Sequence, residues 1–213
     1  MKLWSGVLSP FSAKVRIALA EKGVEVEILE IPWSRERLWG PKPDAFLRVS
    51  PRGEVPTLVD GNLAVFDSTI ICEYLEEAYP APALMPTTPR QRAACRMWEE
   101  RADNLLATRL TVMIRELFLK PDGSGRDAAA VADAQAAFQA YYAALEQGLE
   151  SEDYLCGLYS LADISTWVCL AFARTLGAGF ESQPNLRAWF DRVHARRVVH
   201  TEMEKILAAA AVA

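Results

Sequence analysis

Two serines near the N-terminus, Ser9 and Ser12, are the first side chains whose type and position suggest chemistry. Pro10 follows Ser9, and because proline favours the first turn of a helix, Ser9 is expected at a helix N-terminus. A hydroxyl at this position can donate a hydrogen bond to an anion, while the backbone amides add a positive field. A serine that only caps the helix would look the same. Ser12, one turn further along, is the second candidate and also fits an ordinary helix residue.

Two further short motifs combine turn chemistry with polar groups. Asp67 and Ser68 stand where another helix is expected to begin, and both residue types cap helices, where free backbone amides can hold an anion. Val55 and Pro56 precede a predicted strand. On the residues alone, the proline simply starts that strand.

The cysteines form neither a zinc motif nor a disulfide framework. No two of them have CxxC spacing, and neither of the two histidines lies near them in the sequence. This argues against a metal site and against a disulfide scaffold, so no metal is expected. Each cysteine is expected to be a small buried hydrophobic residue. The residues are Cys72, Cys95, Cys156, Cys169, His194 and His200.

The elements that must position these residues change character near residue 80. Before it, alternating apolar and acidic residues at 24–28 predict a strand, and Asp60-Gly61-Asn62 predicts a hairpin. The expected order is strand, helix, strand, short helix, strand, strand, helix. The ranges are 2–5, 10–22, 24–28, 44–49, 57–59, 63–66 and 68–78.

After this point the chain is predicted to be helical throughout. Four prolines within 79–89 cannot lie inside a helix or a central strand, so this stretch is interpreted as a linker. Helices are expected over 88–119, 126–149 and 164–176, and again from Pro184. A capping box, Ser160 to Asp163, introduces the most apolar of them. The expected fold class is an α/β domain at 1–79, a linker at 80–89 and an all-α domain at 90–213.

Composition excludes several function classes. The chain has 213 residues, 51% of them hydrophobic, and a formal net charge of −5 without a block of like charges. This gives no electrostatic footprint for nucleic acid, so no nucleic-acid partner is expected. No stretch is apolar enough to span a bilayer, and the N-terminus lacks a signal-peptide centre. We therefore expect no membrane partner and a soluble, cytoplasmic protein.

The element order and five motifs together resemble the cytosolic glutathione transferases. Within the first eighty residues they match the thioredoxin-like domain of this family, with the active-site start of its serine-type classes (tau, phi, theta and zeta). Within the helical part they match its folding box and late helix. The motifs are residues 9–19, 54–58, 67–70, 160–164 and 184–189.

The class within the family stays open. Ser9-Pro10-Phe11 looks like the tau class, whereas Val15 to Leu19 is equally similar to the zeta class. Zeta enzymes usually have serine and cysteine where this chain has Pro10 and Phe11, which argues against a maleylacetoacetate isomerase. The absence of cysteine between Ser9 and Ser12 argues against the cysteine-based omega and beta classes.

The resemblance implies that Ser9 activates the thiol of glutathione, with Ser12 in reserve. A cysteine thiol has a pKa near ~8.5, so little thiolate is present at neutral pH. Lowering that pKa by about two units requires roughly 2.7 kcal/mol of preferential interaction with the thiolate. A charge-assisted hydrogen bond and the positive end of a helix can supply this.

The resemblance also implies how glutathione is held as co-substrate. The backbone of Val55, before the expected cis Pro56, would pair with the cysteinyl part as an added strand would. Asp67 and Ser68 would hold the γ-glutamyl ammonium and carboxylate. By analogy Lys42 would meet the glycine carboxylate. Glu54, where several classes have glutamine or lysine, adds a negative charge that Arg52 or Arg48 would have to offset.

Three functions agree with this resemblance. The first is a glutathione transferase, or glutathione-dependent peroxidase, that acts on small apolar electrophiles. The second is a related serine-type isomerase or dehalogenase. The third is a non-catalytic binding protein with the same fold, since fold does not imply function. Family members are also expected to form homodimers, which complete the cleft from two subunits.

Overall fold

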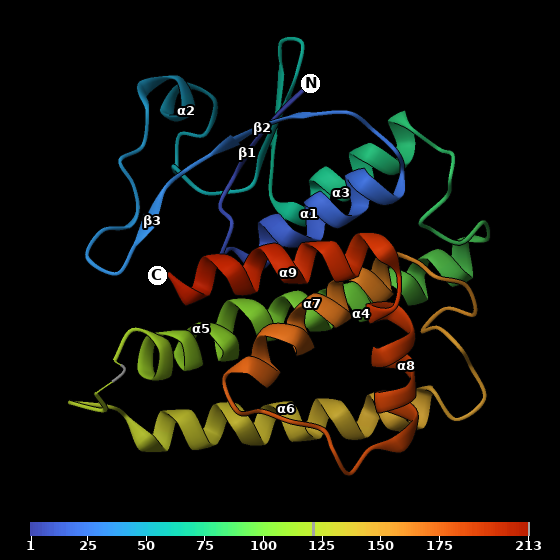
Figure 1. Cartoon of the computed structure of the whole chain (residues 1–213). Helices are drawn as coiled ribbons and strands as arrows, with labels where there is room; N and C mark the ends of the chain where they lie inside the picture. The colour runs from blue at the N-terminus through green and yellow to red at the C-terminus, as the bar shows by residue number, and fades with distance from the viewer. Residues whose placement is uncertain (121, 213) are drawn as a thin grey trace. The chain divides into compact units, whose positions relative to one another are not determined.

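The computed structural model of the chain describes residues 1–120 and 122–212. It separates into two compact units, one of residues 1–84 together with 196–213, the other of residues 85–195 (Figure 1). The first unit mixes strands and helices, and the second is helical, as the fold-class prediction requires. In the part of the chain that the structure describes, no helix has both the length and the apolar character needed to cross a membrane.

The sheet of the first unit has four strands in the order β2, β1, β5, β6. β1 runs parallel to β2 and antiparallel to β5, and β5 is antiparallel to β6. Its strands are β1 (Lys2–Ser5), β2 (Glu27–Glu30), β5 (Thr57–Asp60) and β6 (Leu63–Phe66). A separate short pair joins β3 (Trp33–Ser34) to β4 (Leu38–Trp39). The strand expected at 24–28 therefore lies about three residues later, because the residues after α1 form the turn that leads into it.

Strand register brings the predicted site motifs to one edge of this sheet. Trp4 pairs with Thr57, and Thr57 pairs with Phe66 on its other side. This edge is the end of the sheet at which β1 and β6 finish and β5 begins. Consequently the residues after β1, before β5 and after β6 emerge together, although the chain separates them by about fifty residues.

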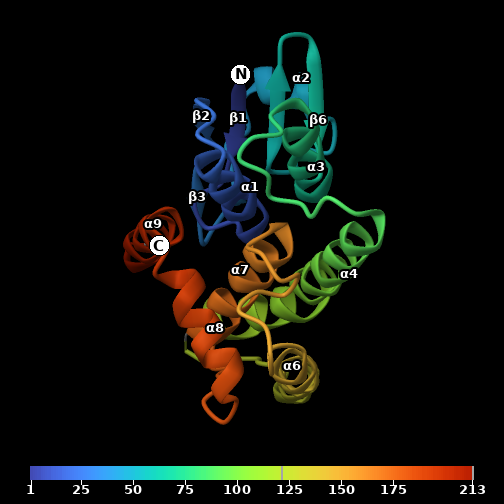
Figure 2. The same cartoon turned by 90° about the vertical axis from the view of Figure 1, so that its right-hand side faces the viewer.

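Helices cover the two faces of the sheet. α1 (Pro10–Glu21) and α3 (Ser68–Ala78) pack against each other, and α3 also contacts β5 and β6 (Figure 2). Successive side chains of β1 alternate between faces. Trp4 therefore points away from α1 and meets Phe46 of α2 (Asp44–Val49), with 5.3 Å between ring centroids.

The last helix, α9 (Arg197–Ala211), packs on α1 and belongs to the first unit. The sequence analysis assigned residues 90–213 to one helical domain, and as domain limits these boundaries stay a prediction. By its contacts, however, the chain returns to the first unit at Arg196, whose guanidinium pairs with Glu21 at 2.8 Å. The alanine-rich sequence of α9 gave no signal of this return.

The second unit is built from long helices. The α4 start is capped as predicted, with the Gln91 amide donating to the Thr88 hydroxyl at 3.3 Å. α4 packs against α7, whose residues are almost all buried. The helices are α4 (Pro89–Leu105), α5 (Thr111–Met113), α6 (Ala128–Gly148), α7 (Leu161–Thr175) and α8 (Pro184–His194), with π-helical segments η1 (Leu106–Leu110) and η2 (Ile114–Phe118) beside α5.

The predicted capping box at the start of α7 is present and fully buried. Both oxygens of the Asp163 carboxylate accept hydrogen bonds. The donors are the Leu155 amide at 3.0 Å, the Ser160 amide at 2.9 Å, the Ser160 hydroxyl at 3.0 Å and the Trp189 indole at 2.8 Å. Burial raises the pKa of Asp163, and these four donors oppose that rise.

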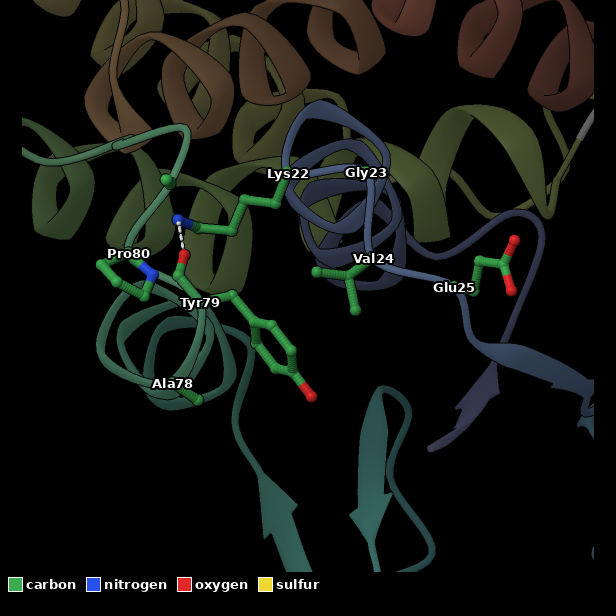
Figure 3. A pocket seen from close by; sticks show the side chains of 8 residues that line it. Lys22, Gly23, Val24, Glu25, Ala78, Tyr79 and Pro80 are labelled. Carbon is green, nitrogen blue, oxygen red and sulfur yellow. Dashed lines mark hydrogen bonds between the residues drawn. The ribbon is translucent and has the colours of Figure 1, made fainter.

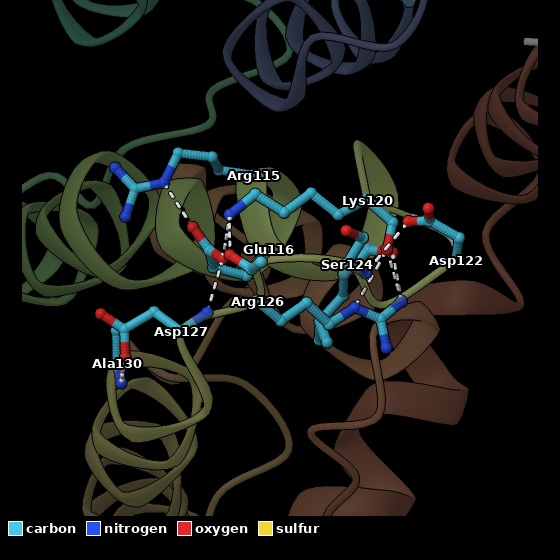
Figure 4. A network of polar contacts seen from close by, with 10 residues as sticks. Arg115, Glu116, Lys120, Asp122, Ser124, Arg126, Asp127 and Ala130 are labelled. Carbon is cyan, nitrogen blue, oxygen red and sulfur yellow. Dashed lines mark hydrogen bonds and ion pairs between the residues drawn. The ribbon is translucent and has the colours of Figure 1, made fainter.

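A second buried carboxylate, Glu116 on η2, stabilises the start of α6 (Figure 4). It accepts from the amide of Asp127, which caps α6, at 2.9 Å. It also pairs with Lys120 at 2.6 Å and with Arg115 at 2.8 Å. These donors, Lys120 first, lower the pKa of Glu116 to about 2. The sequence analysis did not single out this residue.

Candidate active site

Ser9 caps α1, as the sequence predicted. Its Oγ accepts a hydrogen bond from the backbone amide of Ser12 at 3.2 Å. The backbone of Ser9 is extended, which is typical of a cap, and the side chain retains a small exposed fraction of 5%. Among the described residues no acceptor for the Ser9 hydroxyl proton is found. The hydroxyl is therefore able to donate to an anion placed above the helix N-terminus.

Ser12, the reserve candidate, lies deeper. Its side chain has no exposed surface, and its Oγ accepts from the amide of Gly6 at 3.2 Å. This bond joins the first turn of α1 to the loop that leaves β1. The geometry makes Ser12 a residue that supports the loop, because a fully buried hydroxyl cannot contact a ligand.

The Val55–Pro56 peptide is cis, as predicted. Pro56 is buried and directly precedes β5, so the backbone of Val55 lies at the same sheet edge as the start of α1. Peptides 40–41 and 81–82 are also cis, and the sequence analysis did not anticipate either.

Asp67 and Ser68 form the start of α3. The Oδ1 atom of Asp67 accepts from the amides of Thr69 at 2.9 Å and Ile70 at 3.3 Å. Asp67 has a φ of 71°, a left-handed conformation that is unusual for a residue other than glycine. Its side chain is exposed, whereas Ser68 is 4% exposed. Asp67 thus combines capping with an accessible carboxylate.

Lys42 and Glu54 lie on neighbouring loops of the first unit. The Lys42 side chain is exposed and lies along Gly53, with its ammonium 3.1 Å from where a Cβ would stand on that glycine. Glu54 pairs with Arg52 at 3.0 Å, and both side chains are exposed. The sequence analysis required an arginine to offset Glu54, and Arg52 does so.

Two residues near Ser9 escaped the sequence analysis. Lys14, on α1, is fully buried and donates to the Thr69 hydroxyl at 3.0 Å, which links α1 to the start of α3. Trp39, on β4, lies so close to Gly6 that a Cβ there would stand 2.6 Å from its Cη2 atom. The signal for Trp39 was weak, because a lone tryptophan in a polar loop predicts nothing specific. For Lys14 the signal was misleading, since a lysine on a helix is usually exposed.

A surface hollow of about 520 Å³ lies at the opposite end of α1 (Figure 3). Lys22 at its wall already pairs with Glu76 at 2.6 Å and donates to the Tyr79 carbonyl at 2.8 Å. The twelve residues of α1 separate this hollow from Ser9 by about 18 Å. It contains none of the predicted site residues, so we do not assign it to the active site.

Three of the four cysteines are buried, as expected for small hydrophobic residues. Cys156 differs, since it is only partly buried. No group of three or more histidine, cysteine, aspartate or glutamate side chains able to hold a metal ion occurs within residues 1–120 and 122–212.

Comparison with known proteins identifies this arrangement. A family model described as "Glutathione S-transferase, N-terminal domain" matches residues 3–83, and one described as "Glutathione S-transferase, C-terminal domain" matches residues 128–192. Glutathione S-transferase F14 of Arabidopsis thaliana is 30% identical in an alignment of 206 positions that covers 92% of this chain and 80% of that protein. A solved structure of a glutathione S-transferase from Rhodospirillum rubrum F11 has a TM-score of 0.82 and 28% identity, covering 94% of this chain and 90% of that one.

Another relative matches only part of the chain. A stringent starvation protein A homolog of Coxiella burnetii is 42% identical over 97 residues. The match spans 46% of this chain and 44% of that protein, so this chain spans less than half the length of that relative.

Proposed function

Since the chain belongs to the glutathione S-transferase family, we propose that it binds glutathione and activates its thiol with Ser9. The family assignment made from the sequence is thereby confirmed. The mechanism rests on one observation: the Ser9 hydroxyl accepts from the Ser12 amide and keeps its own proton available. Donated to sulfur, that proton stabilises the thiolate over the thiol, and the α1 amides add to the effect.

The remaining contacts of glutathione follow from the sheet edge. The backbone of Val55 pairs with the cysteinyl part in the manner of an added strand. Asp67 and Ser68 receive the γ-glutamyl end, where the carboxylate meets the α3 amides and the ammonium meets the Asp67 carboxylate. Lys42 attracts the glycine carboxylate. The support for these roles is that β1, β5 and β6 bring the first three contacts to one edge.

The second substrate in this proposal is a small apolar electrophile or a peroxide. The thiolate attacks the electrophilic atom, forms a carbon–sulfur bond and displaces a leaving group. Alternatively it attacks a peroxide oxygen, which breaks the O–O bond and gives an alcohol and glutathione sulfenic acid; a second glutathione converts the sulfenic acid to the disulfide and water. We further propose that the protein acts in the cytoplasm as a homodimer. A single mass measurement by light scattering tests the dimer, because a value near 23.6 kDa would contradict it.

Two alternatives stay in view. A glutathione-dependent isomerase or dehalogenase would use the same activated thiol and differ only in the electrophile. The other alternative is a non-catalytic protein with this fold. It is supported by the partial match to a stringent starvation protein A homolog, whose name does not describe a transferase. A turnover screen across chloroarenes, hydroperoxides, isothiocyanates and maleylacetoacetate analogues separates the three.

Ser9→Ala tests the mechanism directly. We expect the bound thiol to titrate at higher pH and turnover at neutral pH to fall roughly thirty- to two-hundredfold, a loss of ~2–3 kcal/mol. Raising the pH should restore part of the rate, because the thiol then ionises without help. Retention on glutathione resin should persist, since Val55, Asp67 and Ser68 are unchanged.

The matched control is Ser12→Ala. It removes the acceptor of the Gly6 amide, so stability should fall. The titration midpoint of the thiol should shift far less than in Ser9→Ala, because the contacts of the Gly6 carbonyl with Arg16 and with the Ser9 amide remain. Ultraviolet thiolate absorbance of the glutathione complex measures the midpoint in all three proteins. If Ser12→Ala raises the titration midpoint of the thiol and Ser9→Ala leaves it unchanged, Ser12 activates the thiol. If neither variant changes the midpoint, the serine mechanism is wrong.

A further inference from the structure

Arg16, on α1, connects the last helix to the loop that presents Ser9. Its side chain is only 9% exposed. The guanidinium donates to the Ser5 hydroxyl at 2.5 Å, to the Gly6 carbonyl at 3.0 Å and to the Val7 carbonyl at 3.2 Å. One side chain therefore holds the last residue of β1 and the two residues that follow it.

The counter-ion of Arg16 comes from α9. Both Nε and Nη2 of Arg16 donate to Oε1 of Glu202, at 2.8 and 2.5 Å, and the Glu202 side chain is 5% exposed. Because a buried guanidinium without a carboxylate is costly, Glu202 is required for Arg16 to keep this position. An ion pair between residues 186 positions apart thus fixes the orientation of the guanidinium.

The loop has further supports, and all of them meet at the same residues. The Gly6 carbonyl that accepts from Arg16 also accepts from the Ser9 amide at 3.0 Å. The Gly6 amide donates to the Ser12 hydroxyl at 3.2 Å. A shift of the guanidinium would therefore move Gly6 and Val7, and through Gly6 would move Ser9.

Charged groups other than Glu202 also face this loop. Glu30, on β2, has a pKa raised by desolvation and then by Glu202, while Arg16 and Lys205 oppose the rise. Arg16 is consequently the cation that two carboxylates share. Glu202 is the carboxylate that forms the ion pair with Arg16, at 2.5 Å.

We propose that Glu202 is a positioning residue for the active site: through Arg16 it fixes the loop at 5–9 and so sets the direction in which the Ser9 hydroxyl donates. The proposal rests on the proposed function for its kinetic consequence, but the structural link can be measured without glutathione. It gives α9 a functional role that the sequence of this helix did not indicate.

The rate effect follows from geometry. A hydroxyl that stabilises a thiolate must lie at hydrogen-bond distance from sulfur, and a misplacement on the order of 1 Å can cost up to about a hundredfold in rate. Glu202→Gln keeps the size of the side chain and removes its charge. We expect the bound thiol to titrate at higher pH and kcat to fall about tenfold, with little change in KM for glutathione, because Val55, Asp67 and Ser68 still bind the peptide.

Glu204→Gln is the matched control. Glu204 lies on the same helix, pairs only loosely with His200 at 3.5 Å and has a 67% exposed side chain. This variant should match wild type in rate and titration midpoint. If Glu202→Gln folds normally and also matches wild type, or if both variants lose the same activity, the positioning role is wrong.

Hydrogen exchange on the unliganded wild-type protein tests the link independently. With increasing urea below the unfolding transition, the amides of Gly6 and Ser9, which are hydrogen-bonded within the loop, should open together with those of α9, as one cooperative unit. Opening of α9 while the loop stays protected would overturn the proposal, even if Glu202→Gln failed to fold. If exchange couples the two segments but the wild type never ionises bound glutathione, the proposed function fails and the structural link stands.

Discussion

The starts of α1 and α7 look alike in the sequence and differ in the structure. Each begins with a buried serine cap, Ser9 or Ser160. At α7 the Ser160 hydroxyl donates to Asp163, whose carboxylate is saturated by four donors. The first turn of α1 has no acidic residue, so the Ser9 hydroxyl has no such acceptor. A capping serine whose proton is used within the protein serves the fold, and one whose proton is available can serve a ligand.

Asp163→Ala should produce the largest effect and act on the fold alone. It leaves three buried N–H donors without an acceptor, and each such group costs about 1–3 kcal/mol. With partial relaxation we expect about 3 kcal/mol of lost stability, or a fall in Tm of roughly 6–12 °C. Calorimetry measures this.

The activity of the folded fraction separates the two helix starts. Below its lowered Tm, Asp163→Ala should keep the thiol titration midpoint of wild type. If Asp163→Ala shifted the thiol titration midpoint and left Tm unchanged, the roles assigned here to the Ser9 and Ser160 caps would be wrong. Asp163→Asn, which retains an acceptor oxygen, should fall between Asp163→Ala and wild type.

Gly6→Ala should act mainly at the start of α1. The new methyl group overlaps the Trp39 indole, and such overpacking costs about 1–3 kcal/mol. Because Gly6 contacts Ser9 and Ser12, the displacement should move Ser9, raise the titration midpoint of the bound thiol, lower kcat and change tryptophan fluorescence. In the double variant with Trp39→Ala the overlap disappears, so stability should recover; if it does not, overlap with the indole is not the cause of the loss.

The start of α6 gives an effect confined to acid pH. The folded protein lowers the pKa of Glu116 to about 2 from the ordinary value of 4.5, so its contribution to stability is full above 4.5 and is lost as pH falls toward 2. Acid unfolding should therefore be less steep in Glu116→Gln between pH 4.5 and 2. If the stability of wild type and of Glu116→Gln fell with pH in the same way, Glu116 would not determine the loss of stability in acid.

Lys42→Ala should have the smallest effect. An exposed ammonium on a loop gains little from a single ion pair in water. We expect KM for glutathione to rise about two- to fivefold at low ionic strength, with kcat unchanged, and the difference should shrink in 0.5 M salt because the interaction is screened. An equal loss at both salt concentrations would mean that Lys42 contributes by packing on Gly53 instead.

Local patterns made most of the fold predictable. Proline after Ser9, Asp67 before an apolar helix, the turn at 60–62 and the Thr88 cap are signals that neighbouring residues carry, and the structure confirms each. The cis peptide at Val55 was also predicted, although by resemblance rather than by local chemistry.

Long-range contacts set the limit of prediction. The pairing of Arg16 with Glu202 joins two residues that look like ordinary surface charges on amphipathic helices, and no local pattern distinguishes them. The contact of Gly6 with Trp39 depends on where a short strand pair folds back. Helix starts were therefore foreseen, whereas the side chains that hold them in place were not.

The contact between α9 and α1 can form only after both helices have been synthesised. Arg16 is translated long before Glu202. At 5–20 residues per second, translation of the 186 positions that separate them takes roughly 10–40 s. During this interval the strands and α1 can form, but the guanidinium lacks the Glu202 carboxylate. The nascent chain should therefore be able to activate the thiol only after Glu202 has left the ribosome.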